Sequence, residues 1–237
     1  MVDERIRTVL ATHRLLGGDD GREVDLGPLR PIRRTTALPP PAEQLAATLT
    51  SALWARSSRV PCPDHPLAGH ELSTVLRMAA GPQRAGGAGR MAMAPSAGGL
   101  ASIDVHLVTQ RVGGVPAGVH RYDRATGVLT STSLGDPATA LRSVLVQPDM
   151  STAAAVLVLV GRLDRTLPHY PARHYRQLFA DTGVLAQNVY LLCAALDLAC
   201  CAVAGFHDHA LGQLVDVDPR IGLPTLAIAI GVPTDRT

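Results

Sequence analysis

The 237-residue sequence contains no lysine and few aromatic residues. Phenylalanine, tryptophan and tyrosine make up 3% of the chain, too few for a surface that stacks nucleic-acid bases. The formal net charge is only +2, so the strong positive field expected of a nucleic-acid-binding protein is missing as well. The absence of lysine, together with abundant alanine, indicates an amino-acid bias shared by proteins of the source rather than a particular function.

Long apolar runs and paired cysteines are also missing. No uncharged stretch of about 18 apolar residues occurs, so we expect no membrane span. The N-terminus is charged from residue 3 and has no signal-peptide core, so we expect a cytoplasmic protein. The four cysteines form no CxxC pair. The segment CPDHPLAGH offers Cys62, His65 and His70 without a fourth ligand nearby, so we expect a surface loop there and no metal.

The hydrophobic content of 46% is enough for one domain with a packed core. Residues 1–41 are interpreted as an N-terminal extension, because they end in the segment ALPPPA, whose consecutive prolines fit neither a helix nor a paired strand. Residues 42–237 then form the main domain.

Hydrophobic periodicity predicts both helices and strands in this domain. Residues 172–197 are apolar nearly all round from Val184 onward, which indicates a long, central buried helix. Residues 153–163 form a continuous apolar run rich in valine, typical of a strand covered on both faces. We expect an α+β fold in which a mainly antiparallel sheet is flanked by helices. The other expected helices are 43–54, 70–81, 136–147 and 208–217, and the other expected strands are 103–109, a hairpin at 118–134, 198–206 and 224–233.

The segment ARSSRV places Arg56 and Arg59 three residues apart with two serines between them, directly after a predicted helix. Guanidinium groups bind phosphate in a bidentate manner and serine hydroxyls add short donors, so this cluster is suited to a terminal phosphate. The alternative is a solvated helix end, where arginines lie near the negative pole of the helix dipole.

Two other segments suit a flat ligand. In APSAGGL, Pro95 fixes a turn and Gly98 and Gly99 allow the backbone to approach a ring closely; the alternative is a plain turn before a strand. In AVAGFHD, the backbone N–H groups of Gly205 and Phe206 follow a buried strand and are placed to reach a ring edge.

Taken together and in order, six segments of this sequence resemble the SagB-type dehydrogenases, a family of nitroreductase-like flavoproteins. They are ARSSR, APSAGGLASIDVHLV, GVHRYD, VLVGRLDR, RQLFADTGVLAQN and AVAGFHD. The resemblance covers residues 42–232 and implies a homodimeric nitroreductase-like fold that binds FMN at its interface.

The resemblance also implies roles for individual residues. It assigns the FMN phosphate to Arg56, Ser57, Arg59 and Arg236, one side of the flavin ring to Pro95, Ser96, Ala97 and Gly98, the opposite side to Gly205 and Phe206, and a place near the flavin or the dimer contact to Gln187 and Asn188.

The activity implied by the resemblance is oxidation of thiazoline or oxazoline rings in a modified precursor peptide to thiazoles or oxazoles. A base removes the acidic proton alpha to the carbonyl, a hydride passes to the flavin, and aromatisation drives the reaction. The azoline-containing peptide substrate would come from cyclodehydratase partner proteins, and molecular oxygen would reoxidise the flavin.

The catalytic part of the pattern departs from the family. Alignment on Gly183 places Arg176 and Gln177 where some members carry a basic residue followed by tyrosine. Tyr175 is one position away, which along a helix rotates a side chain by about 100°. The candidate catalytic residues are therefore Arg176, Tyr175, His174 and Tyr170, and the alternative for all of them is a partly exposed helix start.

Two other functions remain open at this level. One is an NAD(P)H-dependent nitroreductase or another flavin oxidoreductase, because the scaffold hosts many chemistries. The other is a non-catalytic scaffold subunit of a peptide-modifying complex, which the substitution of the expected tyrosine by Gln177 keeps open.

Overall fold

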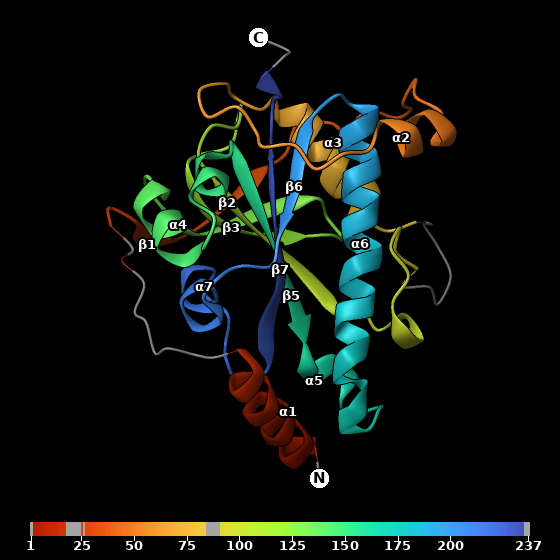
Figure 1. Ribbon diagram of the computed structural model, residues 1–237, viewed down its shortest axis with the longest axis vertical. Coiled ribbons are helices and arrows are strands. Elements are labelled where there is room, and N and C mark those ends of the chain that lie inside the picture. Colours follow the sequence, from red (N-terminus) through yellow and green to blue (C-terminus); the bar gives the residue numbers. More distant parts are fainter. Residues whose placement is uncertain (1, 18–24, 26, 84–90, 235–237) are drawn as a thin grey trace.

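The computed structural model describes residues 2–17, 25, 27–83 and 91–234. A seven-stranded sheet lies at the centre with helices on both faces (Figure 1), which confirms the expected α+β fold. The helices are α1 Val2–Gly17, α2 Leu49–Ala55, α3 Gly69–Ala80, α4 Ala138–Val144, α5 Leu163–Thr166, α6 Tyr175–Ala195 and α7 Asp208–Leu214, with 3-10 turns η1 Ala97–Gly99, η2 Pro148–Thr152 and η3 Ala172–His174. The strands are β1 Arg30–Ala37, β2 Ile103–Thr109, β3 Gly118–Asp123, β4 Val128–Leu134, β5 Ala155–Arg162, β6 Ala199–Val203 and β7 Gly222–Gly231.

The strands follow the order β1-β4-β3-β2-β5-β7-β6, and all neighbouring pairs are antiparallel. The predicted hairpin is present as β3 and β4, and the other predicted strands correspond to β2, β5, β6 and β7. One edge strand, β1, comes from residues that precede the proline-rich segment and pairs with β4. The opposite edge strand, β6, packs against α6. The candidate site residues Gly205 and Phe206 follow β6 in the chain.

Burial on both faces explains the composition of the central strand β5. Ala155, Leu157 and Leu159 belong to the hydrophobic cluster on one face of the sheet, whereas Val156 and Val158 belong to the cluster on the other. Because successive side chains of a strand point to opposite faces, both sets must be apolar. The prediction of a strand covered on both sides is therefore confirmed.

The two faces of the sheet carry different helices. Val9 of α1, Leu72 of α3 and Leu178 of α6 belong to one hydrophobic cluster. Leu141 of α4 and Leu211 of α7 belong to the other, so α4 and α7 cover the opposite face (Figure 1). The site residues are consequently distributed over two faces that the sheet separates.

The helix predicted over 43–54 is shorter than expected. It begins at Leu49, because the Thr48 hydroxyl caps it by accepting a hydrogen bond of 3.1 Å from the Ser51 N–H. Leu49 and Leu53, which recur at the four-residue spacing of an amphipathic helix, are 67% and 52% exposed. The amphipathic pattern is real, but its apolar side faces outward.

The long helix predicted over 172–197 is present as α6, but the expectation that it is buried all round is wrong, because α6 packs on only one face of the sheet. Leu178, Leu185 and Val189 face the core, whereas Phe179 and Val184 are 40% and 41% exposed. Together with η3, the helix is long and apolar enough to cross a membrane by length and composition alone. Packing against the sheet accounts for the apolar residues on its inner side.

Candidate functional site

The segment Arg56–Arg59 leaves the end of α2 and lies against Tyr190 on α6. The Arg56 guanidinium carbon is 5.4 Å from the centroid of the Tyr190 ring, and the Ser58 and Tyr190 hydroxyl oxygens are 3.0 Å apart. The Ala202 N–H on β6 donates to the Tyr190 oxygen at 2.7 Å. Arg56–Arg59 and Tyr190 are termed the arginine half-site below. Tyr190 was not among the predicted site residues, although a tyrosine in an apolar helix is a recognisable signal that its hydroxyl needs a partner.

Arg59 is tied more firmly to the protein than Arg56. Its Nη2 donates to the Leu198 carbonyl at 3.2 Å and lies 3.3 Å from the Asp197 carboxylate, at the turn between α6 and β6. Its backbone N–H donates to the Cys200 carbonyl at 3.0 Å. Arg56 and Ser57 are exposed, and they are therefore the members of the cluster most accessible to an anion.

The residues Pro95–Gly99, termed the glycine turn, form a tight reversal ahead of β2. The Gly99 N–H donates to the Ser96 carbonyl and the Ala101 N–H to the Ser96 hydroxyl, both at 2.9 Å. Gly98 and Gly99 have φ values of +60° and +64°, which favour glycine, and both are exposed. Their backbone is therefore open to a ligand.

Asp181 on α6 holds the glycine turn in place. One carboxylate oxygen accepts hydrogen bonds from the Ala97 N–H at 3.1 Å and the Ser102 hydroxyl at 2.5 Å. The other accepts from the side-chain amide of Gln177 at 3.0 Å. Asp181 is buried, and Gln177, which occupies the expected tyrosine position, serves to orient it. Sequence reasoning did not predict this role, because Asp181 and Ser102 are 79 positions apart.

Two of the four predicted catalytic residues lie at the glycine turn. A Cβ added at Gly98 would be 2.6 Å from the Tyr170 hydroxyl, so this hydroxyl faces the turn backbone. The Tyr170 and His174 rings are stacked, with centroids 4.2 Å apart and an interplanar angle of 6°. The His174 Nδ1 is buried, and within the described part of the chain it has no hydrogen-bond partner.

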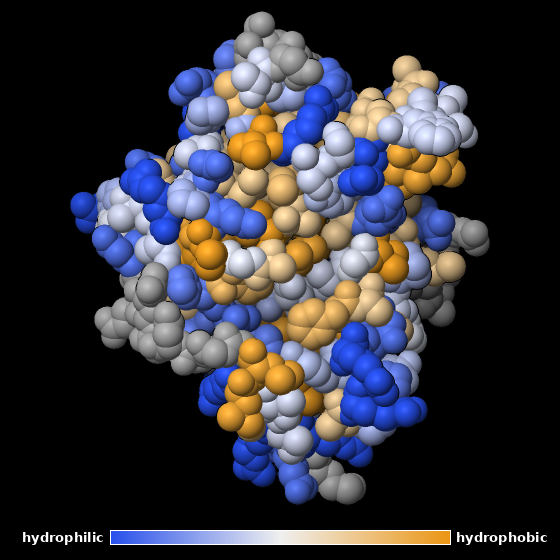
Figure 2. Space-filling model, viewed as in Figure 1, coloured by the Kyte–Doolittle hydropathy of each residue, from blue (hydrophilic) through white to orange (hydrophobic). Residues whose placement is uncertain are grey.

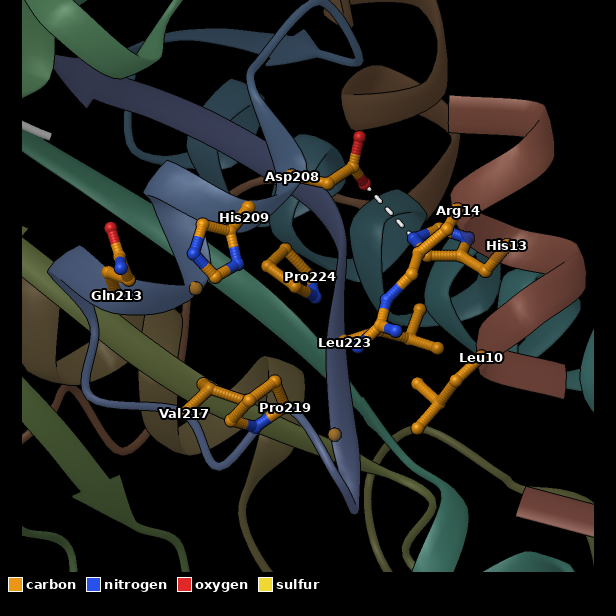
Figure 3. A pocket seen from close by; sticks show the side chains of 12 residues that line it. Leu10, His13, Arg14, Asp208, His209, Gln213, Val217, Pro219, Leu223 and Pro224 are labelled. Carbon is orange, nitrogen blue, oxygen red and sulfur yellow. Dashed lines mark hydrogen bonds and ion pairs between the residues drawn. The ribbon is translucent and has the colours of Figure 1, made fainter. Parts of the chain in front are cut away.

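The other two predicted catalytic residues point elsewhere. The Tyr175 hydroxyl is 2.5 Å from Nδ1 of His13 on α1, and Nε2 of His13 is 3.1 Å from the Asp208 carboxylate on α7 (Figure 3). Burial raises the pKa of Tyr175, and the charge of Asp208 raises it further. Beside this network is an apolar cavity of about 80 Å³ between α1, α7 and β7. Arg176 is exposed on α6.

The structure separates the predicted ring-binding segments within one chain. Asp181 and Tyr190 are nine residues apart, so they project from opposite sides of α6, about 13 Å apart along its axis. The glycine turn is on the Asp181 side and the arginine half-site is on the Tyr190 side. Phe206 pairs with Leu145 and packs against the hydrophobic cluster on the other face of the sheet.

The remaining predicted residues occupy three different settings. Gln187 is exposed on the outer side of α6. Asn188 turns inward, and its amide nitrogen lies 3.4 Å from the Ala79 carbonyl and 3.5 Å from the Met93 carbonyl. Arg236 lies outside the described residues.

The segment that carried the loose metal pattern is a loop before α3. The Cys62 sulfur lies 3.2 Å from Nδ1 of His65. Across residues 2–17, 25, 27–83 and 91–234, no group of three or more histidine, cysteine, aspartate or glutamate side chains is arranged to hold a metal ion.

The antiparallel sheet with helices on both faces is the fold of the nitroreductase-type structures that this chain resembles. The sequence pattern of the nitroreductase family matches residues 30–232. The chain belongs to the nitroreductase family.

Known proteins of several kinds are similar to this chain. A protein of Methanocaldococcus jannaschii named as a nitroreductase is 29% identical over 178 residues, which cover 74% of this chain and 86% of that protein. A crystal structure of a nitroreductase-type protein from Ralstonia eutropha is 29% identical, with a TM-score of 0.73 over 90% of this chain and 98% of that one. The Escherichia coli microcin synthetase complex McbBCD, with truncated pro-MccB17 bound, contains a chain of the same fold at 21% identity. Its TM-score is 0.64 over 94% of this chain and 81% of that one.

The chemistry of the donor set fits a flavin mononucleotide. A structure of the same fold from Exiguobacterium sibiricum was solved in complex with FMN; its TM-score is 0.56 at 12% identity, over 82% of this chain and 92% of that one. In this chain, Arg56 and Ser57 offer exposed donors suited to a phosphate, and Gly98 offers exposed backbone without a side chain.

Proposed function

We propose that the protein is an FMN-dependent dehydrogenase that oxidises thiazoline or oxazoline rings in a modified precursor peptide to thiazoles or oxazoles. The observation that carries this proposal is the exposed glycine turn, which Asp181 clamps and which faces the Tyr170 hydroxyl. The order of the six sequence motifs and the likeness in fold to a chain of a microcin synthetase complex support the same reaction.

In this proposal the arginine half-site holds the FMN phosphate, and the glycine turn and the segment Gly205–Phe206 contact the ring from two sides. The bound flavin supplies a two-electron acceptor for a hydride. The protein binds the peptide, excludes water and positions a group that removes the proton alpha to the carbonyl. The Tyr170 hydroxyl is proposed for that task, and the stacked His174 ring fixes its position.

We further propose a homodimer, because one chain cannot place its own glycine turn and its own Gly205–Phe206 segment on the same ring. Within one chain the sheet separates the two, because the glycine turn is bonded to α6 on one face and Phe206 packs on the other. The outer side of α6 carries Phe179 and Val184, with no side chain at Gly183 between them. Hydrophobic residues lie over the middle of α6 and beside α2 (Figure 2). Such a surface suits a second copy related by a two-fold axis, which would bring the turn of one chain to the β6 loop of the other.

The substrate of this reaction requires ring-forming partners. Azoline rings arise by loss of water from a cysteine, serine or threonine side chain and the preceding amide, so a cyclodehydratase must act first. We propose that such partner proteins supply the peptide in the cytoplasm.

The direct test incubates purified yellow protein with an azoline-containing peptide in air and follows the peptide by mass spectrometry. We expect loss of two hydrogen atoms per ring. Retention of full mass by every thiazoline and oxazoline peptide tested, with flavin demonstrably bound, would reject the assignment.

A second test addresses the phosphate role. We expect Arg56→Ala to lower FMN content while reducing the unfolding free energy of the flavin-free protein by no more than about 1 kcal/mol, because Arg56 is exposed and loses its contact with the Tyr190 ring. Arg142→Ala, at an exposed position on α4, is the matched control. Flavin content is measured by absorbance after denaturation, and equal content in both variants contradicts the proposed phosphate contact.

A general NAD(P)H-dependent nitroreductase is the second candidate, and the two relatives that are 29% identical and carry that name favour it. Rapid bleaching of the yellow protein by NADPH without oxygen would support this function over azoline oxidation. A non-catalytic scaffold subunit is the third, because Gln177 supports Asp181 where a tyrosine was expected. Purified protein without any flavin would support the scaffold role.

A further inference from the structure

A cleft of about 730 Å³ begins where the glycine turn runs into β2 and extends along the ends of β2 and β3. Its size lies within the range of small-molecule and peptide-residue pockets. It is termed the arginine cleft, and its polar walls are formed by Arg121, Arg124, Arg165, His169, Asp104 and Asp123.

Three carboxylates in and around the arginine cleft are already engaged. Asp104 pairs with Arg162 at 2.5 Å, with Arg165 at 2.8 Å and with Arg121 at 3.3 Å. Burial alone would raise the pKa of Asp104, but these three arginines hold it below its usual range. Asp164 accepts two hydrogen bonds from Arg162, at 2.9 and 2.8 Å.

The third carboxylate, Asp123, is used within its own hairpin turn. It accepts hydrogen bonds from the Ala125 N–H at 2.9 Å and the Thr126 hydroxyl at 2.8 Å. These contacts are those of a side chain that stabilises a local turn. Among the described residues Asp123 makes no ion pair with the next residue, Arg124, although its negative charge still acts on that guanidinium.

Arg124 is half-buried, and among the described residues its guanidinium has neither a hydrogen bond nor an ion pair with a carboxylate. Burial lowers the pKa of Arg124 and the neighbouring charge of Arg165 lowers it further, while the charges of Asp104 and Asp123 act in the opposite direction. Arg121, Arg162 and Arg165 all pair with Asp104 or Asp164, which leaves Arg124 as the arginine of the cleft without an ion pair among the described residues. A partly buried charge of this kind favours an anion as ligand.

The guanidinium group of Arg124 lies next to the glycine turn. Arg124 also lines a small cavity with Ser96 and Asp181. Arg165 donates a hydrogen bond of 2.7 Å to the carbonyl of Ala101, immediately after the turn. A charged group bound between these arginines would therefore belong to the same ligand as the ring that reacts at the glycine turn.

We propose that the arginine cleft binds one carboxylate of the peptide substrate, an acidic side chain or the chain terminus close to the ring that is oxidised. A carboxylate carries a single negative charge and matches the one arginine of the cleft without an ion pair, whereas a phosphate would bring close to two charges. This inference rests on the function proposed above, because that function makes a peptide the ligand.

The test compares two probes, acetyl-Gly-Glu-Gly-amide and acetyl-Gly-Gln-Gly-amide, by ligand-observed NMR titration of the flavin-containing protein at low salt. We expect the glutamate probe to bind at least about tenfold more tightly, since a charged hydrogen-bonded pair contributes that much. Arg124→Gln is expected to abolish the difference, and Arg124→Lys to keep part of it. Arg220→Gln, at an exposed arginine that pairs with Asp218 outside the cleft, should change nothing.

Equal binding of the two probes to the wild-type protein, or a preference for glutamate that survives in Arg124→Gln, overturns the inference. Displacement of the glutamate probe by inorganic phosphate at lower concentration, lost in Arg124→Gln, also overturns it in favour of a phosphate ligand. Peptide oxidation and flavin absorbance are recorded on the same preparations. If the protein prefers the glutamate probe over the glutamine probe, and this preference depends on Arg124, the carboxylate site is supported. If the same protein oxidises no azoline peptide, the proposed reaction alone is rejected.

Discussion

Gly98 and Gly99 share a left-handed backbone but differ in what surrounds them. A side chain at Gly98 would meet the Tyr170 hydroxyl at 2.6 Å, whereas nothing lies within 4 Å of a Cβ at Gly99. We therefore expect Gly99→Ala to cost only the backbone strain, about 1 kcal/mol of unfolding free energy, and Gly98→Ala to cost at least about 1 kcal/mol more. Urea denaturation of the two variants measures the difference.

The same pair offers an internal control. Because the clash at position 98 involves the hydroxyl oxygen, Tyr170→Phe should recover most of the extra cost of Gly98→Ala and none of the cost of Gly99→Ala. Equal costs for the two glycine variants would show that Tyr170 does not face the turn.

His106 on β2 makes stability depend on pH. Burial lowers its pKa to about 4, although the nearby Asp104 partly opposes the shift. In the unfolded chain this histidine takes up a proton near pH 6.5, whereas in the folded protein it does so only near pH 4. Between these values the unfolded state binds more protons, so the folded protein loses stability as the pH falls from 6.5 to 4. The loss should reach about 3 kcal/mol in full. His106→Gln should flatten this part of the stability curve, whereas a substitution at the exposed His209 should not.

At the scale of elements, the sequence could predict the strands better than the helices. The valine-rich run of β5 and the alternation in β2 depend only on which faces are buried, and both strands were predicted. The pattern in α2 shows that one side is apolar without showing whether that side meets the core, and Leu53 is in fact exposed. Contacts such as Ser102 with Asp181 join distant segments, so no local pattern indicates them.

The candidate site was predictable in the same uneven way. The motifs predicted which segments would bind a ligand, and that stays a prediction, whereas the placement of the glycine turn and Phe206 on opposite faces of the sheet requires the fold. The role of Tyr175 also depends on α1, a helix that precedes the part of the chain matched by the family pattern.

The contact between Tyr175 and His13 is expected to help hold α1 against the rest of the protein. Tyr175→Phe should cost about 1 kcal/mol of unfolding free energy, because His13 loses its partner, and adding His13→Ala should cost less than it does alone. Chemical denaturation of the two single variants and the double variant measures this coupling. Fully additive costs would contradict the contact, and a large loss of azoline oxidation in Tyr175→Phe with little change in stability would instead assign Tyr175 to catalysis.

At the scale of the whole molecule, exposed apolar side chains are concentrated on the side of the chain that separates the candidate half-sites. Trp54 on α2 is 86% exposed, and Phe179 and Val184 on α6 are exposed as well. Isolated exposed apolar residues are common, but exposed apolar side chains on two neighbouring helices, α2 and α6, are typical of an interface. We expect light scattering to show a dimer, and Val184→Glu to shift it toward a monomer with lower flavin content.

The position of α6 between the glycine turn and the arginine half-site has a genetic consequence. If each flavin site takes its turn from one subunit and its arginines from the other, two inactive variants can complement each other. Arg56→Ala/Ser57→Ala and Gly98→Ala, each inactive alone, would form mixed dimers in which one site inherits both intact halves. Random reassociation of equal amounts should restore about a quarter of wild-type activity, whereas no recovery from demonstrably mixed dimers would place each site within a single chain.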